Sequence, residues 1–192
     1  YSTALYRSGN ATEALQVLRR SAAVGRSNVN FLRRWLALEE QIGNPDVALD
    51  ERMRIWQMNP AETENAVELG KILITATVDS RRILDPKTNK PMFSPREWAR
   101  LPKNDQNRHA DRIRKARALQ SDQIFNELIN RPNPSLPVLF GYADTLEERG
   151  LRDEALEVLE HHVIENDSVG ESERSIMSVD IARRLMDIAE FE

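Results

Sequence analysis

The densest group of basic side chains in the sequence lies between Thr77 and Lys115. This segment has eleven Lys or Arg residues against five Asp or Glu residues, a net charge of +6, while the rest of the chain carries −10. Spaced cations neutralise phosphates, and an aromatic ring among them stacks on a base. We therefore treat the segment as a candidate surface for RNA, DNA or an acidic protein. Its candidate residues are Arg81, Arg82, Lys87, Lys90, Arg96, Trp98 and Arg100.

The favoured interpretation of the same segment is structural. Basic runs are commonly solvated faces, and no RNA-binding fold signature accompanies this one. Its apolar side chains would then pack the segment onto the acidic remainder of the chain, with the charges complementing each other. These apolar residues are Ile83, Leu84, Met92, Phe93, Trp98 and Leu101.

His161 and His162, with Glu157 and Glu165 about one helical turn away, suggest a metal pair, because side chains four residues apart share a helix face. Adjacent histidines point in different directions and no third ligand is indicated, so a surface helix is favoured. Trp35 and Trp56 occur at helical spacing among aliphatic residues, which predicts core packing. We expect neither a metal nor a cofactor.

Signatures of catalysis are missing from the sequence. It contains no Gly-rich phosphate loop, no zinc-protease motif, no calcium loop, no G-x-S-x-G and no cysteine. The many carboxylates fall on predicted solvent faces, with no sequence reason to converge in a dry pocket. We therefore expect a protein that is not an enzyme.

The elements that carry these residues follow a repeat. Gly9-Asn10 recurs 34 residues later as Gly43-Asn44, and Ala14-Leu15 recurs at the same distance as Ala48-Leu49. A third copy begins at Gly150, followed by Ala155, Leu156 and Leu159. Each Gly separates two segments of helical period, which predicts helix-turn-helix hairpins. Such hairpins cover one another's apolar faces by stacking as a solenoid.

In its later units the sequence resembles the tetratricopeptide repeat. The residues that carry the resemblance are Ala66, Leu69, Gly70 and Leu73 in the third unit, and Leu139, Tyr142, Ala143, Leu146, Ala155 and Leu159 in the fourth. The second unit departs from the pattern at Leu36 and Arg52, where a small and an aromatic residue are usual. The resemblance implies an all-α fold, a right-handed α-solenoid. We expect one domain over 1–192, with repeats at about 1–28, 29–62, 63–135 and 136–169.

The third repeat is 39 residues too long, which predicts an insertion at about 77–115, between its two helices. Counting back from Leu136 puts Ser121 and Phe125 at the small and aromatic places of its second helix. Within the insertion we predict a short helix from Ser94 that ends at Pro102, then a longer helix from Asp105. A terminal helix at 172–191 lies outside the repeat register. We expect it to cap the solenoid, the alternative being a link to a further repeat.

The tetratricopeptide resemblance also implies a concave groove, lined by first helices, that binds a peptide or helix of another protein. The corresponding residues are Asn30, Arg33, Ala37, Glu40, Val67, Lys71, Ile74, Phe140, Asp144 and Glu147. Ala37 and Val67 replace the Asn and Lys with which one subgroup grips a C-terminal carboxylate. The leading hypothesis is therefore a scaffold or adaptor for an unidentified protein partner. The alternatives are RNA or DNA binding through 77–115, and a structural spacer or oligomerisation segment.

The chain has no apolar run of 18 residues, so no segment predicts membrane insertion. Its first residues do not read as a signal peptide, and it lacks a starting Met, so we expect a fragment of a longer protein. The absence of cysteine fits several compartments. Localisation is left open, with the cytoplasm slightly favoured.

Overall fold

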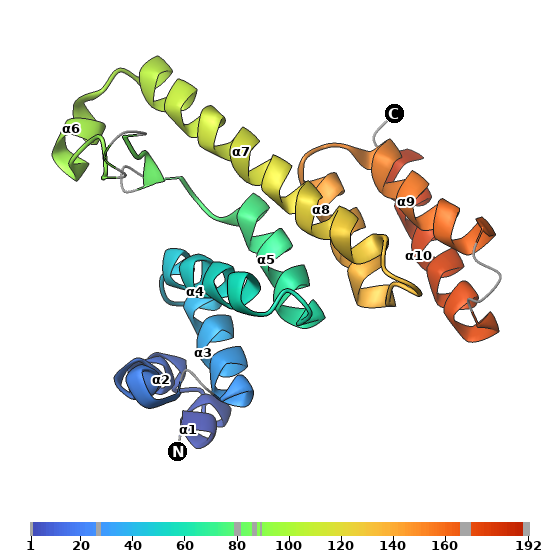
Figure 1. The fold of residues 1–192 in the computed structure, drawn as a ribbon, viewed down its shortest axis with the longest axis horizontal. Helices are drawn as coiled ribbons and strands as arrows, with labels where there is room; N and C mark the ends of the chain where they lie inside the picture. Colours follow the sequence, from blue (N-terminus) through green and yellow to red (C-terminus); the bar gives the residue numbers. More distant parts are fainter. Residues whose placement is uncertain are drawn as a thin grey trace. The chain divides into compact units, whose positions relative to one another are not determined.

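The computed structural model describes residues 2–25, 28–78, 82–85, 88, 90–165 and 170–189. Over these residues the chain forms ten helices and no strand (Figure 1), which confirms the predicted all-α class. The helices are α1 (Ser2–Arg7), α2 (Ala11–Gly25), α3 (Val29–Gln41), α4 (Pro45–Met58), α5 (Thr63–Thr75), α6 (Pro95–Arg100), α7 (Lys103–Ile129), α8 (Leu136–Glu148), α9 (Arg152–Glu165) and α10 (Glu171–Ala189).

Contacts divide the chain into two compact units, Tyr1–Glu62 and Thr63–Glu192. The division coincides with the predicted boundary between the second and third repeats. We call the two parts unit 1 and unit 2 and describe each by itself. The single domain expected over 1–192 stays a prediction.

Unit 1 consists of two helical hairpins, in which α1 packs on α2 and α3 packs on α4. Gly9 has a φ of +84°, a left-handed conformation that suits glycine at the end of a helix. In the second turn the Asn44 side chain accepts a hydrogen bond from the backbone N–H of Asp46, and Pro45 occupies the first turn of α4. The predicted turns at Gly9 and Gly43 are confirmed.

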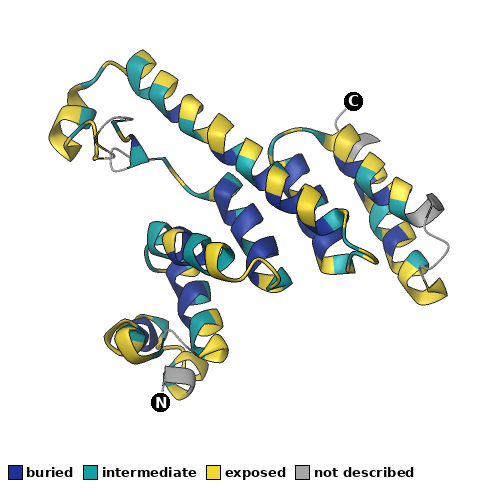
Figure 2. Cartoon of the chain, in the orientation of Figure 1, coloured by how far each residue is buried: buried dark blue, intermediate teal, exposed yellow. Residues whose placement is uncertain are grey.

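Unit 2 pairs α5 with α7 and α8 with α9, and it also packs α5 on α8 and α9 on α10. Gly150 turns the chain between α8 and α9 with a φ of +78°. Figure 2 shows the buried residues of this unit gathered on α5, α8 and the second half of α7. One core cluster joins Leu139, Ala143 and Leu146 of α8, Ala155 and Leu159 of α9, and Met177 of α10.

Helices α5 and α7 approach each other closely at Gly70, as predicted for the third repeat. A methyl group at Gly70 would overlap the ring of Phe125, which is fully buried, so only glycine allows the two helices to approach this closely. The hydroxyl of buried Ser121 donates a hydrogen bond to the Gly70 carbonyl at 3.0 Å. Ser121 and Phe125 therefore lie at the helix contact to which residue counting assigned them.

The insertion begins where α5 ends at Thr75. Leu84 and Pro91 form an isolated antiparallel bridge, and the backbone N–H of Met92 donates to the carbonyl of Ile83 at 2.7 Å. Ile83 is buried, so the bridge fixes an apolar anchor of the insertion.

Two helices follow within the insertion, as predicted. Ser94 and Glu97 form a capping box at the start of α6, which ends before Pro102. Helix α7 then runs without interruption for 27 residues, so the last part of the predicted insertion and the predicted second helix of the third repeat fall on one helix. In Figure 1 it reaches from α8 to α6.

The terminal helix α10 begins 35 residues after α8, close to the repeat period. Met177 is buried in the core shared with α8 and α9. One side of α10 therefore packs on the α8–α9 hairpin, which is the position expected for the first helix of a following hairpin. Among the described side chains of α10, four large apolar residues are exposed, whereas a capping helix normally presents a polar outer face. These residues are Ile176, Val179, Leu185 and Met186.

Candidate functional site

In unit 1 the predicted groove residues all lie on α3. Asn30 and Arg33 are exposed, Ala37 is half-buried, and Glu40 forms an ion pair of 2.6 Å with Arg52 of α4. That pair explains how Arg52 stands buried at a place where the repeat pattern has an aromatic residue. The exposed and half-buried members leave the α3 surface open next to α1.

A hollow of about 350 Å³ lies on this surface, between α1, α2 and α3. Leu18, Ala37 and Leu38 give it an apolar floor, and polar side chains surround the floor. We call it the unit 1 hollow; its lining residues are Tyr6, Arg7, Leu18, Arg34, Ala37, Leu38 and Gln41. An apolar floor with convergent polar groups is the usual make-up of a binding site.

Beneath the α3 surface, the carboxylate of Glu39 is fully buried. Arg19 of α2 donates to it twice at 2.7 Å, the Trp35 ring N–H donates at 2.9 Å, and the Asn44 backbone N–H donates at 3.0 Å. Burial works to raise the pKa of Glu39, but these hydrogen bonds outweigh it and hold the pKa below its ordinary value. Glu39 thereby joins α2, α3 and the turn before α4.

No sequence pattern predicts this buried carboxylate. Its only local signal is that Glu39 follows Trp35 by four residues, which places both on one helix face. The Gly43 backbone lies so close that a methyl group there would overlap the Glu39 carboxylate, so this glycine is required by packing. The core role predicted for Trp35 is confirmed, since its side chain is buried, and Trp56 is half-buried.

In unit 2 the predicted groove residues are largely occupied by contacts within the chain. Val67 is buried rather than open to a groove, because Gly141 of α8 lets the two helices approach until little space remains above it. Lys71 forms an ion pair with Asp144 at 3.4 Å. Ile74 and Phe140 are half-buried, and Phe140 packs against the core cluster.

Arg184 of α10 engages the two remaining groove residues. Its guanidinium is buried and forms ion pairs of 2.8 Å with both Asp144 and Glu147 of α8, and of 2.6 Å with Asp180 of its own helix. Burial alone would lower the pKa of Arg184, but the bonds to Asp144, Asp180 and Glu147 raise it above its ordinary value. Helix α10 is therefore fixed to α8 by charge as well as by Met177.

The candidate basic residues of the insertion differ in their exposure. Arg81 and Lys87 lie outside the described residues, Arg82 is half-buried, and Lys90, Arg96 and Arg100 are exposed. These last three have no carboxylate partner in the part of the chain that the structure describes.

Trp98 packs against two other rings of the insertion and is half-buried. Its ring lies 5.9 Å from that of Phe93 and 6.4 Å from that of His109, and Phe93 meets His109 edge-on at 5.2 Å. The three rings form a small aromatic cluster between α6 and α7. Trp98 is half-buried, so part of its ring packs within the insertion, and His109 has a packing role that the sequence did not indicate.

His161 and His162 lie on α9. The His162 pKa is lowered, by burial first and by the neighbouring His161 after it, although the Val158 carbonyl opposes the shift. No three His, Asp or Glu side chains among the described residues are grouped to hold a metal ion.

Together these observations define an all-α protein built from helical hairpins, with an open surface in unit 1 and an exposed basic insertion in unit 2. Comparisons of the chain with protein-family models, with curated proteins and with solved structures found no match. Within the described ranges, no helix has both the length and the apolar character to cross a bilayer.

Proposed function

We propose that the chain is a protein-interaction module of tetratricopeptide type, with hairpins stacked as a solenoid and a first-helix face that binds a segment of another protein. The register supports this proposal, because α3 and α5 begin 34 residues apart and α8 and α10 begin 35 apart. The glycines at hairpin turns and the contact of Gly70 with Phe125 fit the same family pattern.

The unit 1 hollow is the observation that carries the proposal. It contains Ala37, a groove residue that the resemblance implies, and its floor is apolar while its rim is polar. In unit 2, by contrast, Lys71, Asp144 and Glu147 are engaged in ion pairs within the chain. The first-helix face of unit 1 is therefore the better binding surface.

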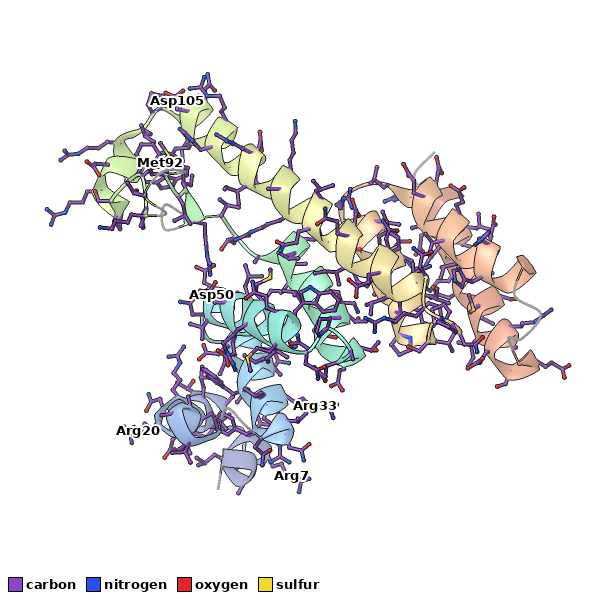
Figure 3. All side chains as sticks on the ribbon, viewed as in Figure 1. Arg7, Arg20, Arg33, Asp50, Met92 and Asp105 are labelled. Atoms are coloured by element: carbon purple, nitrogen blue, oxygen red, sulfur yellow. The ribbon has the colours of Figure 1, made fainter. Side chains whose placement is uncertain are left out.

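The partner segment should carry an apolar anchor flanked by acidic residues. Leu18 and Leu38 on the floor would receive the anchor, because burying an apolar side chain there removes it from water. Arg7 at the rim is exposed and forms no ion pair among the described residues, so it remains available for a carboxylate. Arg33, on the same helix as Ala37, adds positive charge to this side (Figure 3).

Selection of displayed random 12-residue peptides against the whole chain tests this function. We expect peptides with an acidic residue beside a large apolar one. Their affinity should fall at least 10-fold, about 1.4 kcal/mol, in Ala37→Trp, which fills the hollow, and in Arg7→Glu, which reverses the rim charge.

Arg20→Glu is the matched control, because Arg20 is exposed on α2 and lies on the other side of unit 1 from Arg33 (Figure 3). It changes the net charge by the same amount as Arg7→Glu and should leave the affinity within twofold. Circular dichroism checks that each variant stays helical. Peptides that bind Ala37→Trp as tightly as the unmodified chain would refute the proposed site.

A further inference from the structure

The first half of α7 has one packed face and one exposed face. On the packed face the Gln106 side chain donates hydrogen bonds to the carbonyls of Trp98 and Leu101 at 2.8 and 3.0 Å, His109 joins the aromatic cluster, and Ala110 is buried. Side chains on the opposite side of the helix point away from these contacts. Figure 2 shows this half of α7 largely exposed.

The exposed face forms a continuous polar surface along about 16 Å of helix, at 1.5 Å per residue. We call it the α7 stripe; it consists of Asn104, Asn107, Arg108, Asp111, Arg112 and Lys115, which together line one shallow hollow. It contains no apolar residue. The basic surface predicted from the sequence lies earlier in the insertion and does not include this stripe, although the residues of the stripe recur at helical spacing.

The α7 stripe carries unbalanced positive charge. Arg108 forms an exposed ion pair with Asp105 at 2.7 Å, and Asp111 forms one with Arg114 at 2.8 Å. Exposed pairs of this kind contribute little and open readily to a stronger anion. Arg112 and Lys115 are exposed and have no carboxylate partner among the described residues.

The composition of the α7 stripe favours a nucleic acid over a protein. The core of a protein interface needs aromatic or aliphatic anchors and is depleted in lysine, and the stripe offers no such anchor. Phosphates need only cations and amide donors. Single strands are usually held by stacking on exposed rings, whereas Trp98 and Phe93 lie in the aromatic cluster.

We propose that the α7 stripe binds B-form duplex DNA through its phosphates. The major groove of B-DNA admits an α-helix, whereas that of duplex RNA is too deep and narrow for side chains to read. Arg112 and Lys115 contact phosphates, with Arg108 as a third cation. Asn104 and Asn107 lie where amide groups reach further phosphates or base edges. This binding is independent of the peptide site proposed in unit 1.

Fluorescence anisotropy with a labelled 20-base-pair DNA duplex of random sequence, from 50 to 300 mM KCl, tests the proposal. Three phosphate contacts predict that log K falls with log salt concentration with a slope of about −2.7. The double variant Arg112→Gln with Lys115→Gln should reduce this slope to about −1 and weaken binding roughly 100-fold at 50 mM salt.

The control is Arg96→Gln with Arg100→Gln, which removes the same charge from α6 and should leave binding within threefold. Equal loss in both double variants would overturn the assignment to α7, because net charge alone would then explain the binding. Absence of salt-dependent binding by the unmodified chain would overturn the proposal entirely. So would equal or tighter binding of duplex RNA, of a single strand, or of a poly-glutamate peptide of matched length.

Discussion

At the scale of single residues, Gly70 sets the distance between α5 and α7. The Phe125 ring occupies the space where a side chain at Gly70 would lie, and the Ser121 hydroxyl bonds to the Gly70 carbonyl. Alanine, which is favourable in an isolated helix, is therefore unfavourable at position 70.

We expect Gly70→Ala to destabilise unit 2 by about 1–3 kcal/mol through overpacking, although alanine is the better helix former by about 1 kcal/mol. Urea unfolding followed by circular dichroism measures the change. In a Phe125→Leu background the smaller side chain leaves room, so the cost of Gly70→Ala should shrink. An equal cost in both backgrounds would show that the ring is not the cause.

Single residues also show where sequence reasoning succeeds and where it stops. Ser121 and Phe125 were located by counting along the repeat, because the spacing of a repeat fixes which residues meet. Glu39 and Arg184 were missed, because their partners Arg19 and Asp144 are 20 and 40 residues away and no local pattern links them. Val67 was expected in a groove and is buried, because its exposure depends on how closely α8 approaches.

At the scale of helices, Arg117 joins α7 to the end of α5. Its buried guanidinium donates to the carbonyl of Ala76 at 2.7 Å and to that of Thr77 at 3.3 Å. The last carbonyls of a helix lack partners within it, so this contact completes the end of α5. The same contact holds Ala76 and Thr77, where the chain leaves α5, beside α7.

Arg117→Met keeps most of the packing volume and removes the donors. We expect unit 2 to lose about 1–3 kcal/mol and the amides of the last turn of α5 to exchange with solvent faster. Hydrogen exchange measured by mass spectrometry reports both effects. Arg114→Met, an exposed neighbour on the same helix, should change stability by less than about 0.5 kcal/mol. Unchanged exchange in α5 would contradict this role for Arg117.

Helix ends were predicted better than helix surroundings. The capping box of Ser94 and Glu97 located the start of α6 within one residue, because caps are local hydrogen bonds that the sequence encodes directly. Which side of α7 faces solvent could not be derived in the same way. It depends on the aromatic cluster, which brings Phe93 and Trp98 against His109.

At the scale of the whole molecule, the chain consists of two compact units. The residues before the boundary, from Gln57 to Ala61, are exposed, and each unit has its own buried residues. A part of a chain that has its own buried core can fold separately. Sequence periodicity predicts a boundary between repeats at this point, but it contains no signal that the contacts divide there.

We expect residues 63–192, expressed alone, to be helical and to unfold cooperatively on heating. Far-ultraviolet circular dichroism checks this. Residues 77–192 form the matched control, because they lack α5 and leave Ser121, Phe125 and Leu128 without their partner helix, so their helical signal should fall sharply. Equal behaviour of the two fragments would mean that α5 is not required for the core of unit 2.

The contact of Arg117 with Ala76 also means that the chain departs from the hairpin and returns to it at nearly the same point. The segment between Ala76 and Arg117 therefore begins and ends at neighbouring positions. A segment with neighbouring ends is suited to replacement, so a fluorescent reporter or a foreign epitope grafted in its place should be displayed without disturbing the packing of α5 on α7.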